Sequence, residues 1–258
     1  MIIEYHRPET MEQAKKLLSR SKPLTIPLGG GTLVSHPSQD PVAVVDLQAL
    51  GLDKIINDES IIKIGSMVRL QSLVESSILP EGLSHSARRE TNINIRRAAT
   101  IGGLMMTAGG NSPLLGCFLS LDARLYWEPG DKFIYLSEWI GKNREQKPGK
   151  LITSIEFTLP ERILYEDIAR SAEDRPIVYV VASIWKTQET RVVVGGAGKY
   201  PVVASDSSNN LFTKFFDRHA ISSILDRSGY DAYQQAAIQT LIDRITPHKS
   251  MFGRKGDE

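Results

Sequence analysis

Three consecutive glycines, Gly29 to Gly31, constrain the fold more than any other stretch of this 258-residue chain. They stand between two apolar segments in the sequence PLGGGTLV, residues 27–34. Glycine loses more freedom on folding than any other residue, so three in a row indicate that another group approaches the backbone closely. Bare backbone N–H groups after a strand suit an anion such as phosphate. A plain turn is the alternative, and the glycines alone do not decide between the two.

A second glycine segment, ATIGGL at residues 99–104, follows about 70 residues later. The two segments could converge on one ligand from two strands, and a diphosphate needs about that many donors. Neither segment has the Gly-Lys-Ser/Thr ending of a P-loop, and neither has the G-x-G-x-x-G spacing of a Rossmann turn. If a nucleotide binds here, it is held in another way.

Composition excludes several other classes of function. The chain is 41% hydrophobic and 24% charged, with a formal net charge of +1 and no basic stripe, so nucleic acid is not an expected partner. No apolar run is long enough to span a bilayer, and the N-terminus lacks a secretion signal, so a cytoplasmic protein is expected. Cys117 is the single cysteine and should be a buried small apolar residue. With no catalytic constellation in the sequence, a cofactor should carry any reactive atoms.

The periodicity of apolar residues predicts a mixed α+β fold. Thr10 begins a capping box for a helix, and Ser112 followed by Pro113 suits the start of another helix. Alternation over residues 151–159 predicts a strand that Pro160 ends. The other predicted strands are 24–28, 42–47, 61–65, 177–185, 191–194 and 201–204. Four further helices are predicted: one that begins near Leu70, one over 82–90, one over about 210–225 and one over 231–245. The last three strands predict a three-stranded C-terminal sheet carrying helices.

In order along the chain, eight segments resemble the flavin-binding medium subunit of molybdenum hydroxylases, the group of carbon monoxide dehydrogenase and xanthine dehydrogenase. PLGGGTLV is similar to the family's A-G-G-T-D-L loop. NIRRAATIGGLMMTA resembles I-R-N-x-A-T-I-G-G-N, the most specific motif of the set. LLGCFLSLDARL resembles P-A-L-L-A-L-D-A, and PGKLITSIEFTLP resembles the strand that closes the flavin domain. RVVVGGAGKYPVVA resembles part of the small C-terminal domain, so the resemblance covers nearly the whole chain.

The resemblance implies two domains. Residues 1–160 would form an FAD-binding domain of the PCMH type, with subdomains at about 1–57 and 58–160. Residues 161–258 would form a C-terminal domain of the CO dehydrogenase flavoprotein type, with a three-stranded sheet and helices.

The resemblance also implies an FAD site. The loop from Leu28 to Val34 would wrap the diphosphate through backbone N–H groups, and Thr100 to Gly103 would approach it from the other side. Leu151 and Ile152 would lie near one ring of the cofactor, although both also read as core residues of a strand. The implied cofactor-binding residues are Leu28, Gly29, Gly30, Gly31, Thr32, Leu33, Val34, Thr100, Ile101, Gly102, Gly103, Asn111, Ser112, Leu151 and Ile152.

As a member of this family the chain would relay electrons through FAD from a partner [2Fe-2S] subunit to an acceptor. An iron–sulfur small subunit and a molybdopterin large subunit would be its partners, and the heterotrimer could form a dimer. Three positions depart from the family pattern, because Leu33, Leu104 and Pro113 stand where the family has polar residues. An alternative is therefore a degenerate subunit that keeps the fold and serves in docking or assembly without flavin. An unrelated nucleotide-binding module would explain the glycines but not the order of the other motifs.

Overall fold

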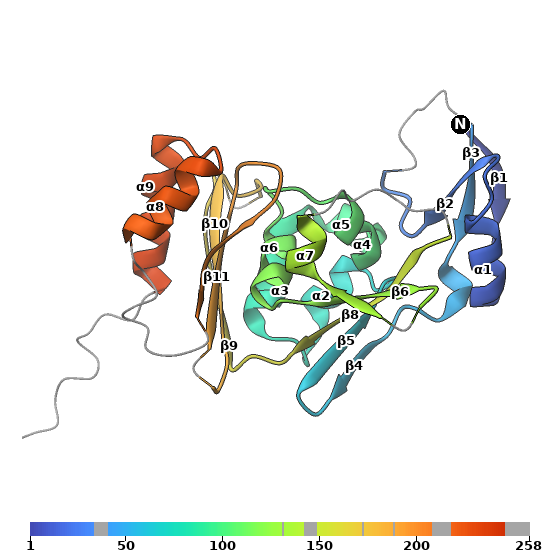
Figure 1. Ribbon diagram of the computed structural model, residues 1–258, viewed down its shortest axis with the longest axis horizontal. Helices are drawn as coiled ribbons and strands as arrows, with labels where there is room; N and C mark the ends of the chain where they lie inside the picture. Colours follow the sequence, from blue (N-terminus) through green and yellow to red (C-terminus); the bar gives the residue numbers. More distant parts are fainter. Residues whose placement is uncertain are drawn as a thin grey trace, which may run out of the picture.

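The computed structural model describes residues 1–33, 41–130, 132–141, 149–171, 173–187, 189–207 and 218–245. Three sheets follow one another along the long axis of the molecule, and a group of short helices lies between the last two (Figure 1). The N-terminal sheet lies at one end, and the C-terminal sheet with its two helices lies at the other.

The N-terminal sheet is small and parallel. Its strands are β1 (Ile2–His6), β3 (Val42–Asp46) and β2 (Leu24–Leu28), in that spatial order. Helix α1 (Met11–Leu18) begins with the predicted capping box at Thr10. Ala14 and Leu18 pack with Val45 and with Leu151 of the second sheet, so this unit is tied to the rest of the chain by an apolar cluster.

The second sheet is antiparallel and has the order β4 (Ile55–Asp58), β5 (Ile61–Gly65), β8 (Leu151–Thr158), β6 (Arg124–Glu128) and β7 (Phe133–Tyr135). The alternation over 151–159 correctly predicted β8. The helices beside this sheet are α2 (Leu70–Glu75), α3 (Glu81–Glu90), α4 (Ile93–Ala98), α5 (Ile101–Thr107), α6 (Pro113–Ser120) and α7 (Leu136–Ile140). Ser112 caps α6 and Pro113 is its first residue, as predicted.

The C-terminal sheet has four strands, so the prediction of three was wrong. Its order is β12 (Val202–Ser207), β11 (Thr190–Gly195), β10 (Val178–Ile184) and β9 (Arg162–Ile168). The missed strand is β9, which lies at the edge of the described sheet and pairs with β10. Ile163 and Tyr165 face one apolar cluster while Leu164 and Ile168 face another. Because both faces of β9 are covered, its sequence lacks the simple alternation of a half-exposed strand.

Two helices, α8 (Arg218–Arg227) and α9 (Ala232–Ile245), cover the outer face of this sheet. The predicted helix over 231–245 is confirmed. Residues 210–217 of the other predicted helix lie outside the described part of the chain, and α8 covers the remainder.

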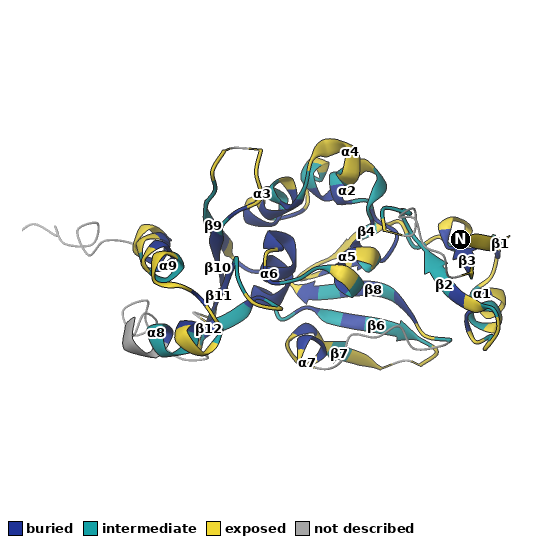
Figure 2. Cartoon of the chain, turned by 90° about the horizontal axis from the view of Figure 1, so that it is seen from above, coloured by how far each residue is buried: buried dark blue, intermediate teal, exposed yellow. Residues whose placement is uncertain are grey.

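The inner face of the C-terminal sheet packs against helix α6, and α6 and the central strand β10 are dark blue in Figure 2. The ring of Tyr179 packs directly on two glycines. A Cβ on Gly116 would lie 2.4 Å from the ring, and a Cβ on Gly195 would lie 2.0 Å from it. Its hydroxyl donates a hydrogen bond to the carbonyl oxygen of Ser112 at 2.6 Å. One apolar cluster therefore crosses residue 160 and includes Tyr179, Val181 and Val193. The division into domains at residue 160 stays a prediction.

Candidate functional site

A cavity of about 620 Å³ opens between the N-terminal sheet, helix α5 and the start of β8. Ligand sites of drug-sized molecules commonly have volumes of roughly 300–1,000 Å³. Both glycine segments line this cavity, although about 70 residues separate them in sequence. The predicted site residues that line it are Gly29, Gly30, Gly31, Thr32, Leu33, Thr100, Gly102, Gly103, Asn111, Ser112, Leu151 and Ile152.

Two of the proposed residues that the structure describes, Leu28 and Ile101, do not line the cavity. Leu28 ends β2 just before the glycines, and Ile101 is fully buried in the large apolar cluster. Val34 lies outside the described residues. The sequence left open whether Leu151 and Ile152 are core residues or line the site. Each is 4% exposed and belongs to an apolar cluster, and each also lines the cavity.

The first glycine segment packs against the chain itself. A Cβ on Gly30 would lie 1.9 Å from the carbonyl oxygen of Ala98, and one on Gly29 would lie 2.6 Å from the Thr100 hydroxyl. Protein atoms therefore explain the absence of side chains at these two positions. Gly31 has a φ of +71°, which favours glycine. Among the described residues, none accepts a hydrogen bond from the backbone N–H groups of residues 29–32. With respect to the described part of the chain, these N–H groups are available to a ligand.

The second glycine segment differs, because the N–H groups at the start of α5 already have partners. Those of Ile101 and Gly102 donate to the carbonyl oxygens of Val68 and Ser66 at 3.0 Å and 2.8 Å. That of Gly103 donates to the Thr100 hydroxyl at 3.3 Å. A Cβ on Gly103 would meet only this hydroxyl, so Gly103 gives the cavity open space rather than a donor. The expectation that this segment also offers a row of free backbone donors is not supported.

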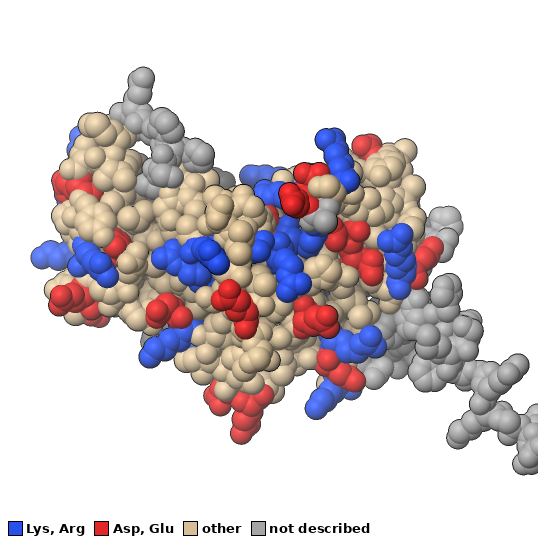
Figure 3. All heavy atoms as spheres, turned by 180° about the vertical axis from the view of Figure 1, so that it is seen from behind, with Lys and Arg blue, Asp and Glu red and all other residues tan. Residues whose placement is uncertain are grey.

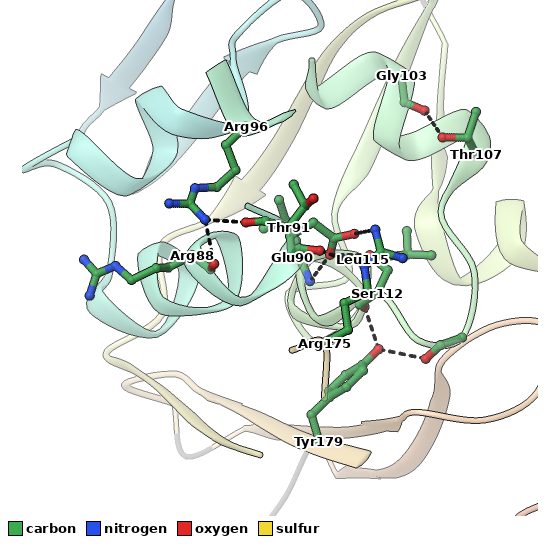
Figure 4. A network of polar contacts seen from close by, with 12 residues as sticks. Arg88, Glu90, Thr91, Arg96, Gly103, Thr107, Ser112, Leu115, Arg175 and Tyr179 are labelled. Atoms are coloured by element: carbon green, nitrogen blue, oxygen red, sulfur yellow. Dashed lines mark hydrogen bonds and ion pairs between the residues drawn. The ribbon is translucent and has the colours of Figure 1, made fainter. Parts of the chain in front are cut away.

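The far end of the cavity carries charge. Glu90, the last residue of α3, and Arg175, between β9 and β10, are the only charged side chains among the described residues that line it. The Glu90 carboxylate accepts hydrogen bonds from the Ser112 hydroxyl at 2.7 Å and from the Leu114 N–H at 3.2 Å. Burial raises the pKa of Glu90 to about 7, although these hydrogen bonds and Arg175 act in the opposite direction. Figure 4 shows Glu90 and Ser112 together, with the Tyr179 hydroxyl directed at the Ser112 backbone.

Sequence reasoning missed Glu90, Arg175 and Ser66. Ser66 lies beside Gly102 at the cavity wall, and its buried hydroxyl has no hydrogen-bond partner among the described residues. Glu90 and Arg175 are 85 residues apart in sequence, and each occurs in a polar stretch without a motif. The packing of the C-terminal sheet against α3 and α6 brings them together. Pro113 is buried in α6, and the carboxylate beside Ser112 comes from Glu90 of α3.

Other sites are not supported in the part of the chain that the structure describes. No group of three or more His, Cys, Asp or Glu residues there could hold a metal ion. Cys117 is buried as predicted, and burial raises the pKa of its thiol to about 12. Among the described residues, no helix has the length and apolar character needed to cross a membrane. On the face shown in Figure 3, basic and acidic side chains are interspersed.

The family follows from the sequence profile that matches this region. The profile described as "FAD binding domain in molybdopterin dehydrogenase" matches residues 1–160, which include both glycine segments and the start of β8. The chain belongs to this family. The resemblance seen in the motifs is thereby confirmed.

Relatives and solved structures agree with this assignment. The uncharacterized protein YgfM of Escherichia coli is 32% identical over 133 residues, which are 51% of this chain and 51% of YgfM. The match thus spans about half the length of that relative. Carbon monoxide dehydrogenase from Hydrogenophaga pseudoflava contains a chain similar at a TM-score of 0.76 and 16% identity, covering 95% of this chain and 96% of that one. Quinoline 2-oxidoreductase from Pseudomonas putida contains a chain similar at a TM-score of 0.74 and 14% identity. The similarity covers 94% of this chain and 95% of that one. At such low identity the likeness shows the fold.

Proposed function

We propose that this chain binds FAD in the cavity and serves as the flavin subunit of a molybdenum hydroxylase-type oxidoreductase. The observation that carries the proposal is the convergence of the two glycine segments and the start of β8 on one cavity of about 620 Å³. The family match gives the class of ligand, because the matched profile is that of an FAD-binding domain.

The wall of the cavity fits such a ligand. The free N–H groups of residues 29–32 would donate to the diphosphate, since N–H donors bind a charged acceptor more strongly than a neutral one. The orphan hydroxyl of Ser66 would gain a partner. Leu104, Met106 and Ile152 offer apolar surface for a ring. Bound FAD would supply the electron-transfer chemistry, while the chain orients it and limits its contact with water.

Partner subunits would hold the other redox centres. Cys117 is the only cysteine in the sequence and is buried, so the chain cannot supply a set of thiolates to an iron–sulfur cluster. We place the [2Fe-2S] cluster in a small subunit and molybdopterin in a large subunit, with electrons passing from the cluster through FAD to an acceptor. A dimer of such heterotrimers and a domain division at residue 160 are parts of the same proposal.

Two side chains in the cavity wall favour a second candidate function, docking or assembly without flavin. Leu33 and Leu104, which replace polar residues of the family pattern, both line the cavity. Each removes a possible polar contact with the cofactor. A subunit that keeps the fold for docking or assembly and binds no flavin would tolerate both.

Binding of FAD to the purified chain separates the two functions. We expect protein incubated with FAD and then desalted to keep the visible absorption bands of flavin and to release FAD on denaturation. A titration that follows flavin fluorescence gives the dissociation constant. Protein that stays colourless and shows no binding at millimolar FAD would favour the assembly role.

Isolation of the complex tests the partners. A tagged chain expressed in its native host should co-purify with a subunit that carries iron and acid-labile sulfide and with one that carries molybdenum. A chain that purifies alone under gentle conditions, with FAD bound, would leave the flavin site standing and remove the proposed complex.

A further inference from the structure

Helix α5 separates the two ends of the cavity. Thr100, at its N-terminal end, adjoins the first glycine segment through Gly29. Thr107 and Gly109, at and just beyond its other end, line the cavity with Asn111 and Ser112. Seven residues of α-helix span about 10 Å at roughly 1.5 Å per residue. Arg175 and Glu90 therefore lie at the end away from the free N–H groups that suit a diphosphate.

Arg175 is held by Glu90 along one edge of its guanidinium, and its other edge has no hydrogen-bond acceptor among the described residues. Its Nε donates a hydrogen bond to the Glu90 backbone oxygen at 2.9 Å, and its Nη2 lies 3.7 Å from the Glu90 carboxylate. The side chain is 50% exposed and lines the cavity. Within the described part of the chain, no group accepts a hydrogen bond from either Nη atom. The outer edge of a planar, charged donor thus remains available to a ligand.

We propose that Arg175 binds a heteroaromatic ring of the dinucleotide and that Glu90 positions it; this inference rests on the proposed binding of FAD. A guanidinium can stack on an aromatic ring and can donate in its plane to ring carbonyl or ring nitrogen acceptors. The flavin ring and the adenine ring both present such acceptors. Because Arg175 is far from the glycine loop, a ring rather than the diphosphate is the part of the ligand that it reaches.

Glu90 is suited to a positioning role because it is held from several directions. Ser112 and Leu114 donate to its carboxylate, and Tyr179 in turn fixes the Ser112 backbone. The ionisable groups around it are Arg175, which favours its charged form, and Tyr179, whose pKa its charge helps to raise. A charged Glu90 attracts the guanidinium more strongly than a neutral one does, so ligand affinity should rise from pH 6 to pH 8.

The experiment compares ligand binding by wild type, Arg175→Ala, Arg175→Lys and Arg170→Ala. Arg170 is exposed in the same segment between β9 and β10 and does not line the cavity, so it is the matched control. Dissociation constants are measured for FAD, FMN and ADP. We expect Arg175→Ala to weaken FAD binding at least tenfold, Arg175→Lys to weaken it less, and Arg170→Ala to change it less than twofold. Melting temperatures show whether each variant is folded.

The ligands identify the ring. A loss shared by FAD and FMN but not ADP assigns Arg175 to the flavin ring, and a loss shared by FAD and ADP but not FMN assigns it to adenine. FAD affinity within twofold of wild type in Arg175→Ala would overturn the inference and leave the proposed function intact. Wild type that binds none of the three ligands would overturn both.

The positioning role of Glu90 has its own readout. In Glu90→Gln the FAD affinity should stay constant between pH 6 and pH 8, while in wild type it should increase severalfold. A parallel increase in both proteins would remove Glu90 from the inference.

Discussion

The two ends of the cavity offer a ligand different kinds of contact. At one end, residues 29–32 offer backbone N–H groups, and no charged side chain of a described residue lines the wall. At the other end, Glu90 and Arg175 bring opposite charges together under partial burial. The backbone end depends on close packing between two loops, whereas the charged end depends on the docking of the C-terminal sheet against α6. A change at the first end should therefore act through geometry, and a change at the second should depend on pH.

The largest effect is expected from Gly30→Val. Because a Cβ at this position would lie 1.9 Å from the Ala98 carbonyl oxygen, the loop must move. We expect the free energy of unfolding to fall by about 3 kcal/mol, the upper part of the usual range for overpacking. Urea denaturation measures it. A variant as stable as wild type would show that the loop has room, and would return the glycine to a purely ligand-related role.

At the charged end, Glu90→Gln should alter the dependence of stability on pH. The folded protein holds the Glu90 proton more tightly than the unfolded chain, so its contribution to stability is full below pH 4.5 and is lost as the pH rises toward 7. A rise in pKa from 4.5 to about 7 corresponds to a loss of about 3 kcal/mol relative to the Gln variant.

Urea denaturation at pH 5 and pH 8 measures this difference. Glu81→Gln, an exposed position at the other end of α3, is the control and should follow wild type at both values. Equal pH dependence in wild type and Glu90→Gln would show that Glu90 is ionised with an ordinary pKa.

Gly103→Val should separate ligand binding from folding. Its Cβ would meet only the Thr100 hydroxyl, at 3.3 Å, and would otherwise occupy the cavity. We expect FAD affinity to fall at least tenfold, which is about 1.4 kcal/mol, while stability changes by less than about 1 kcal/mol. Fluorescence titration and thermal denaturation of the same samples measure both. Unchanged affinity would mean that the ligand does not approach α5 here.

The smallest effect is expected from Thr100→Val. This substitution keeps the side-chain shape and removes the hydroxyl that caps α5 by accepting from the Gly103 N–H. Loss of such a cap costs about 1 kcal/mol. Thr240 is exposed within α9, so Thr240→Val is the control. It should lower the free energy of unfolding by less than half of the loss seen in Thr100→Val. Equal losses in the two variants would show that the cap contributes nothing specific.

Local patterns in the sequence located much of the fold. The capping box at Thr10, the Ser112–Pro113 start of α6 and the alternation in β8 each depend on a few neighbouring residues, and all three were correctly predicted. Strand β9 was missed because its two faces pack against different clusters, so no local period marks it. Glu90 and Arg175 were missed for a related reason, since neither belongs to a motif.

By itself, the sequence determined the family and the two glycine segments, because both depend on the order of residues along the chain. Only the tertiary structure decided which glycines accommodate protein, which backbone N–H groups stay free, and which charges reach the cavity. Those outcomes depend on contacts between segments far apart in sequence: Gly30 with Ala98, Gly102 with Ser66, and Arg175 with Glu90. Such contacts form when the sheets pack together, and no local pattern encodes them.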